Sequence, residues 1–106
     1  MKIDLKSTID IESSLRAGQA NKVLKQILNQ GESHYIVFSK HCRKEMSDDN
    51  LTSVDIINVL QGGRIIDDPE LEKGTYRYRV ETPNIIVVIA FCKPHMIRCV
   101  TAWRKK

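Results

Sequence analysis

Residues 75–91, TYRYRVETPNIIVVIAF, predict two neighbouring strands at the centre of the fold. From residue 75 to residue 81, aromatic or aliphatic side chains alternate with charged ones, as in a strand with one buried and one exposed face. The first set comprises Tyr76, Tyr78 and Val80, and the second comprises Arg77, Arg79 and Glu81. Residues 82–84, TPN, form a turn. Residues 85–91 are apolar throughout, which indicates a central strand buried on both faces.

Further strand-like stretches lie on both sides of this pair. Residues 96–104 form the last strand, and residues 64–67 form a short one that leads into an acidic turn around Pro69 and Gly74. Residues 34–38, HYIVF, are rich in β-branched and aromatic side chains and favour another short strand. The sequence therefore predicts a sheet of three to four antiparallel strands.

Helical patterns dominate the first part of the chain. Apolar residues recur at three- and four-residue spacing from Thr8 to about Gln30. Gly18 divides this stretch into a short and a longer helix, and Gly31 is a plausible stop. Residues 1–31 are thus predicted to be N-terminal helices.

Two more helices have recognisable starts. Ser39 caps a helix from Lys40 to about Asp48, while Thr52 and Asp55 form a capping box ahead of an apolar run. Gly62 and Gly63 end that second helix. Helices first and strands later predict an α+β domain, with the N-terminal helices on one face of the sheet. A chain of 106 residues is the size of a single domain, 1–106, with residues 34–106 as its core.

The net charge of +4 is concentrated towards the C-terminus. Residues 61–106 hold nine Lys or Arg and five Asp or Glu, and beyond Gly74 the only acidic residue is Glu81. Clustered basic side chains attract phosphates, so we expect a polyanion such as RNA as the partner. The alternative is a solvated surface whose charges protect strand edges.

The sequence also favours a cytoplasmic protein without a membrane partner. The first eleven residues lack the continuous apolar run of a secretory signal, and no segment approaches the length of a membrane span. Three cysteines without a C-x-x-C pair fit reduced thiols better than a disulfide framework.

A longer stretch of the chain resembles a known family. Residues 38–66, FSKHCRKEMSDDNLTSVDIINVLQGGRII, are followed by TYRYRV, IIVVIAF and IRCVTAW. This order resembles a bacterial domain-of-unknown-function family with an S-x-H-A-x-x-R-M motif and a closing T-[VA]-[WY] motif. The resemblance implies the superfold of barnase, EndoU, colicin ribonuclease domains and RelE-type toxins. It also implies a toxin of a toxin–antitoxin pair, with a cognate antitoxin as partner in a hetero-oligomer.

The motif positions match only in part. The shared residues are Ser39, His41, Met46, Thr101 and Trp103. Glu45 and Asp49 stand where the family has arginines, so the charge is reversed at both positions. Arg43 and Lys44 are close enough in sequence to substitute for them as RNA-binding residues.

Four residues are the candidates for catalysis of RNA cleavage: His41, Arg77, Arg79 and Thr101. Attack of a 2′-OH on the neighbouring phosphate needs a base, an acid and cations for the oxyanion, and gives a 2′,3′-cyclic phosphate end without a metal or cofactor. His41 suits proton transfer, because histidine titrates near neutrality. Arg77 and Arg79 are one strand repeat apart, ~7 Å, and can straddle one phosphate. The further RNA-binding candidates are Arg43, Lys44, Arg98, Trp103 and Arg104.

Structural alternatives exist for these residues. His41 can be a helix side chain that bonds a backbone carbonyl, and Arg77 and Arg79 can pair with Glu70, Glu72 or Glu81. Cys92, His95 and Cys99 have a C-x2-H-x3-C spacing, but no fourth ligand is evident, and packing cysteines are the simpler interpretation.

Two functions are consistent with the sequence, and a domain without any nucleic-acid role is the third alternative. The first is a toxin-like, metal-independent endoribonuclease that acts on RNA, including ribosome-bound mRNA. The second is a non-catalytic domain on the same fold, which binds nucleic acid or protein and lacks activity because its two arginines are missing.

Overall fold

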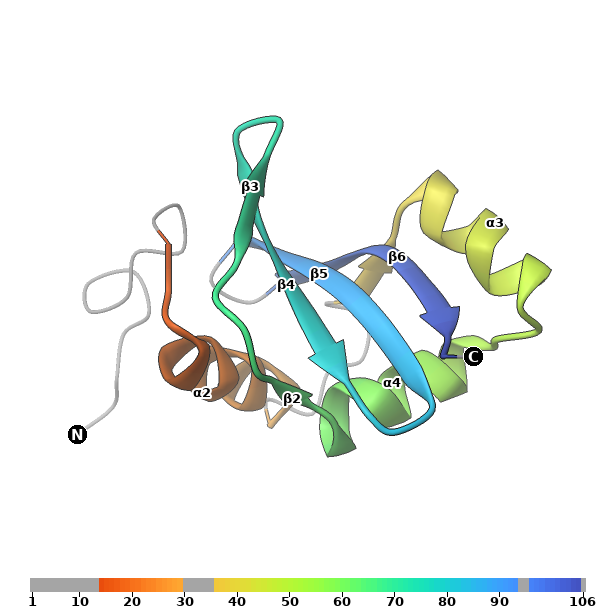
Figure 1. Cartoon of the computed structure of the whole chain (residues 1–106), viewed down its shortest axis with the longest axis horizontal. Coiled ribbons are helices and arrows are strands. Elements are labelled where there is room, and N and C mark those ends of the chain that lie inside the picture. The colour runs from red at the N-terminus through yellow and green to blue at the C-terminus, as the bar shows by residue number, and fades with distance from the viewer. Residues whose placement is uncertain (1–13, 30–35, 94–95, 106) are drawn as a thin grey trace.

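The computed structural model describes residues 14–29, 36–93 and 96–105. The helices and strands of this part of the chain make an α+β fold (Figure 1). They are α2 (Ala17–Leu28), β1 (Ile36–Phe38), α3 (Lys40–Asp48), α4 (Ser53–Gly62), β2 (Arg64–Ile65), β3 (Glu70–Glu72), β4 (Thr75–Glu81), β5 (Ile85–Lys93) and β6 (Met96–Arg104).

The sheet is larger than predicted and mixed. Its strands follow the order β1-β6-β5-β4-β2, and β3 pairs with β4 beside β2. The predicted strands β4, β5 and β6 form its antiparallel centre, but the predicted total of three to four strands is too low, and β1 runs parallel to β6. A parallel neighbour is possible here because a long stretch of chain separates the two strands.

The additional strand, β3, belongs to a tight hairpin that the sequence-based interpretation took for a turn. Lys73 and Gly74 both have positive φ, 52° and 78°, as in the two-residue turns that match the twist of paired strands. This turn pairs Glu70 with Arg77 and Glu72 with Thr75. The hairpin of β3 and β4 projects beyond the rest of the sheet (Figure 1).

The core lies between the sheet and the helices α2 and α4. Tyr78 and Val80 of β4 face this layer, as their alternation predicts, and both are buried. The hydroxyl of Tyr78 accepts a hydrogen bond of 3.0 Å from the backbone N–H of Leu15, which anchors the segment before α2 to the sheet. Arg77 and Arg79 therefore face the opposite side, which we call the outer face.

The predicted N-terminal caps of α3 and α4 are confirmed, whereas the predicted break at Gly18 is wrong. The hydroxyl of Ser39 caps α3, and Thr52 and Asp55 form the predicted capping box of α4. Gly18 does not divide a helix, because it is the second residue of α2. Most of the predicted first helix, Gly31 and the start of the predicted strand 34–38 lie outside the described residues.

The helix α3 lies along the edge of β6. At its start, the Ser39 hydroxyl donates a hydrogen bond of 2.9 Å to the Val100 carbonyl, and at its end, the Arg104 backbone N–H donates one of 2.8 Å to the Asp49 carboxylate. Across the outer face, the elements thus follow one another from β3 and β4 through β5 and β6 to α3. Within the described residues, no helix has the length and apolar character needed to cross a membrane.

Candidate functional site

A hollow of about 280 Å³ lies on the outer face of the sheet. Its floor comes from three adjacent strands, because the strand register sets Arg79 beside Val88 and Val88 beside Thr101. The sheet residues that line it are Arg77, Arg79, Val88, Thr101 and Trp103. Three of the four predicted catalytic residues therefore meet at one place.

A β-bulge decides which way Thr101 faces. Val88 pairs with Thr101, whereas the next residue, Ile89, pairs with Cys99, so Val100 is an extra residue in β6. Cys99 is buried in the core, and simple alternation from it would turn Thr101 towards the core as well. The extra residue reverses the alternation and leaves Thr101 on the outer face.

The two arginines of the hollow have different surroundings. The guanidinium of Arg79 lies 5.7 Å from the centre of the Trp103 ring, within the range of a cation–π contact, and has no ion pair among the described residues. Arg77 pairs with Glu72 of β3, with Nη1 and Oε2 3.4 Å apart. One of the pairings that the sequence left open for Arg77 is thus present in the structure.

Acidic side chains form another part of the wall of the hollow. They come from the segment 67–72, which we call the acidic segment, and are Asp67, Asp68, Glu70 and Glu72. The sequence-based choice of site residues left them out, because the stretch was interpreted as a surface turn. With four carboxylates and two guanidinium groups, the hollow is not the purely basic surface that the charge distribution predicts.

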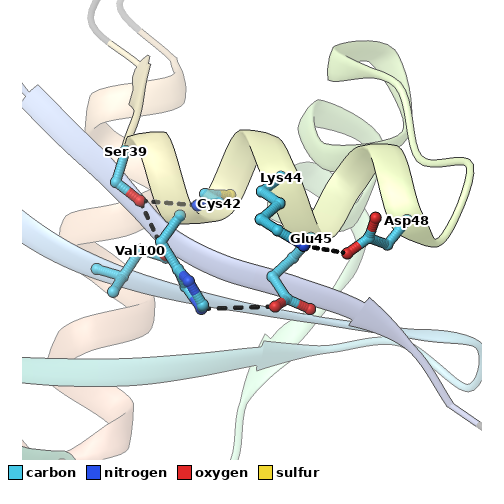
Figure 2. A network of polar contacts seen from close by, with 7 residues as sticks. Ser39, Cys42, Lys44, Glu45, Asp48 and Val100 are labelled. Atoms are coloured by element: carbon cyan, nitrogen blue, oxygen red, sulfur yellow. Dashed lines mark hydrogen bonds and ion pairs between the residues drawn. The ribbon is translucent and has the colours of Figure 1, made fainter.

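His41 lies apart from the other three catalytic candidates. It belongs to the first turn of α3, its side chain is 65% exposed, and it is not among the residues that line the hollow. Its Nε2 is 3.7 Å from the carboxylate of Glu45, one helical turn further on. Glu45, one of the two charge reversals, thus lies beside the histidine, and Figure 2 shows Glu45 on α3 between Cys42 and Asp48.

Asp49, the other reversal, has a structural role together with Arg104. The carboxylate of Asp49 accepts the backbone N–H of Arg104, and the guanidinium of Arg104 donates to the carbonyls of Asp49 and Asn50 at 2.8 and 3.1 Å. A cation at the C-terminal end of a helix is favourable. The guanidinium of Arg104 thus holds the end of α3 against β6, and the binding of RNA by this residue stays a prediction.

We expect Asp49→Ala to lower the free energy of unfolding by about 1 kcal/mol, because the Arg104 N–H then loses a charged acceptor. Urea denaturation measures the change. Asp48→Ala is the matched control: its carboxylate only pairs with Lys44 on the exposed side of α3, at 3.1 Å (Figure 2), so about 0.5 kcal/mol or less should be lost. Equal losses in the two variants would contradict the docking role of Asp49.

The remaining RNA-binding candidates are spread over the surface. Arg43 and Lys44 are exposed on α3, and the hydrogen bond from Lys44 to Asp48 raises the pKa of the lysine. Arg98 is exposed on β6 and lines a different hollow, together with Tyr76 and Phe91. Of the five candidates, only Trp103 lies at the hollow of the outer face.

The cysteines that the structure places in the core are not suited to nucleophilic or metal chemistry. Burial raises the pKa of Cys42 to about 11 and also raises the pKa of Cys99, so both remain thiols at neutral pH. His95, the middle residue of the C-x2-H-x3-C spacing, lies outside the described residues. Within those residues, no group of three His, Cys, Asp or Glu side chains is arranged to hold a metal ion.

Neither the curated proteins nor the solved structures contain a match to the chain. The sequence model of the family described as Domain of unknown function (DUF4258) matches residues 38–104, from the end of β1 to the end of β6. The matched region includes α3, α4 and every strand that contributes to the hollow, and it covers more than half of the chain, which therefore belongs to the DUF4258 family.

Proposed function

We propose that the outer face of the sheet binds single-stranded RNA and that the domain is a metal-independent endoribonuclease of the toxin type. The observation that carries this proposal is the meeting of Arg77, Arg79, Thr101 and Trp103 around one hollow. These side chains offer what an RNA strand needs: guanidinium groups for phosphate, a hydroxyl donor, and an aromatic ring for stacking. The relationship to the RelE-type superfold is part of the same proposal.

The order of elements suggests a path for the RNA. A strand that crosses β4, β5 and β6 towards α3 meets Arg79, then Thr101, then the helix that carries His41. In this arrangement Arg79 and Thr101 stabilise the charge on the phosphate. His41 acts either as the base that takes the proton of the attacking 2′-OH or as the acid that gives a proton to the leaving 5′-oxygen. A cognate antitoxin would then act by covering the hollow.

The experiment is induction of the chain in a bacterium, followed by mapping of RNA ends. We expect growth arrest and RNA fragments with 2′,3′-cyclic phosphate ends, and loss of both effects in Arg79→Ala and His41→Ala. Lys22→Ala, an exposed change on α2 behind the sheet, is the control and should remain toxic. Normal growth and intact RNA in the presence of folded protein would refute the enzymatic proposal.

Binding is tested separately with purified protein and a single-stranded RNA oligonucleotide. Loss of one phosphate-contacting arginine costs ~1.4 kcal/mol, so Arg79→Ala should bind about tenfold more weakly. Wild-type affinity should fall steeply with salt, because RNA binding releases counterions. Affinity that is independent of both Arg79 and salt would contradict binding at the hollow.

The acidic wall favours a second candidate, a non-catalytic domain that binds a basic segment of a partner protein. Four carboxylates beside two arginines complement a segment rich in Lys and Arg. This candidate predicts salt-sensitive binding of an oligo-lysine peptide, weakened by Glu70→Gln, without toxicity and without RNA binding.

A further inference from the structure

The acidic segment lies at the phosphate-binding side chains rather than away from them. All four of its carboxylates line the same hollow as Arg77 and Arg79. An RNA phosphate that enters the hollow therefore meets carboxylates as well as two guanidinium groups, and one of these, that of Arg77, is already paired with Glu72. Like charges repel within a few ångströms, so the carboxylates oppose the entry of a second anion.

The hairpin turn holds this segment in place. Because Lys73 and Gly74 reverse the chain tightly, β3 pairs with β4 and brings Glu70 opposite Arg77. The carboxylate of Glu72 is then 3.4 Å from the Arg77 guanidinium. The contact is built by backbone pairing and does not depend on a long flexible loop.

In the part of the chain that the structure describes, not every N–H group of the Arg77 guanidinium has a hydrogen-bond acceptor. Its side chain is 23% exposed, and its Nε is buried without a hydrogen-bond partner within the described residues. Glu72, in contrast, is 57% exposed and is free to turn away into solvent. A tetrahedral oxyanion that replaced Glu72 could accept from the guanidinium with more than one oxygen.

We propose that the acidic segment is an intramolecular competitor of RNA phosphate, and that Glu72 sets the affinity of the hollow by occupying Arg77. This inference rests on the proposed function, because it requires that the hollow binds RNA. Phosphate binding then has to displace the Glu72 carboxylate, and the domain holds RNA more weakly than its two arginines would allow.

The experiment measures binding of a fluorescent 2′-O-methyl oligonucleotide, which lacks the 2′-OH that cleavage requires. An exposed ion pair is weak, so Glu72→Gln should tighten binding about two- to fivefold. Asp48→Asn is the matched control: it removes one negative charge from an ion pair on α3, outside the hollow. The control should change the affinity by less than about 1.5-fold at ionic strengths where distant charges are screened. Circular dichroism verifies that each variant is folded.

The competitor must act through Arg77, which a double-mutant cycle tests. In an Arg77→Ala background, Glu72→Gln should give no gain in affinity, because the occupied cation is absent. A fall in affinity for Glu72→Gln alone would show that Glu72 positions Arg77 for RNA. Such a fall would overturn the proposed competition, and so would an unchanged affinity. In both cases the proposal that the hollow binds RNA would stand. If neither the wild type nor Glu72→Gln binds the oligonucleotide, the competition and the proposed function fail together.

Discussion

Gly63→Ala is expected to lower the free energy of unfolding by about 3 kcal/mol or more, measured by urea denaturation. A Cβ at this position would lie 2.6 Å from the Val59 carbonyl oxygen and 2.8 Å from the Glu81 carbonyl oxygen. Both atoms belong to backbone, so neither can rotate away. The end of α4 would have to separate from β4, the strand that carries both arginines of the hollow.

The reason is lack of space and not backbone strain. Gly63 has a φ of −85°, which any residue adopts, and it is buried. Its neighbour Gly62 is the matched control, because a Cβ there would meet nothing within 4 Å. Gly62→Ala should leave stability unchanged or raise it by up to about 1 kcal/mol, since alanine favours the helix. Similar unfolding energies for the two variants would contradict the close approach of α4 and β4.

What the sequence predicted well was determined by residues close together in the chain. The alternation in residues 75–81 assigned Tyr78 to the core and Arg79 to the outer face because side chains of a strand alternate. The caps at Ser39 and Thr52 were predictable because each bonds a backbone N–H three residues ahead. None of these features depends on how distant segments meet.

The strand β3 was missed because it has no hydrophobic pattern to detect. All three of its residues are exposed, and Leu71 is 60% exposed between two glutamates. Its pairing comes from the tight turn at Lys73 and Gly74, and a Lys-Gly pair is a weaker hairpin signal than Asn-Gly. As a result, the acidic wall of the hollow was missed too.

The separation of His41 from the hollow, and the role of Asp49, depend on long-range contacts. The position of α3 is fixed by bonds from Ser39 to Val100 and from Arg104 to Asp49, which join residues 61 and 55 positions apart. The sequence contains no local signal for either bond. Helix periodicity alone therefore could not show whether His41 faces the arginines.

Stability should fall as the pH rises from about 9 towards 11, because the core contains buried thiols. Burial raises the pKa of Cys42 from 9.0 to about 11, and this residue of α3 is fully buried against the core. Below pH 9 both the folded and the unfolded chain hold the proton, so this thiol makes no pH-dependent contribution. Between the two values the unfolded chain binds fewer protons, and the free energy of unfolding decreases with pH by about 3 kcal/mol in total.

Burial acts in the same direction on two other groups of the core, since it also raises the pKa of Cys99 and of Tyr78. The contribution of Cys42 is isolated with Cys42→Ala, compared with the wild type by urea denaturation at several pH values under reducing conditions. The variant starts from a lower stability because it leaves a small cavity. Its loss of stability with rising pH should nevertheless be shallower, because one of the buried protons is absent. If the free energy of unfolding of the variant fell with pH as steeply as that of the wild type, Cys42 would have to reach solvent and ionise in the folded chain. That result would contradict the close packing of α3 along the edge of β6.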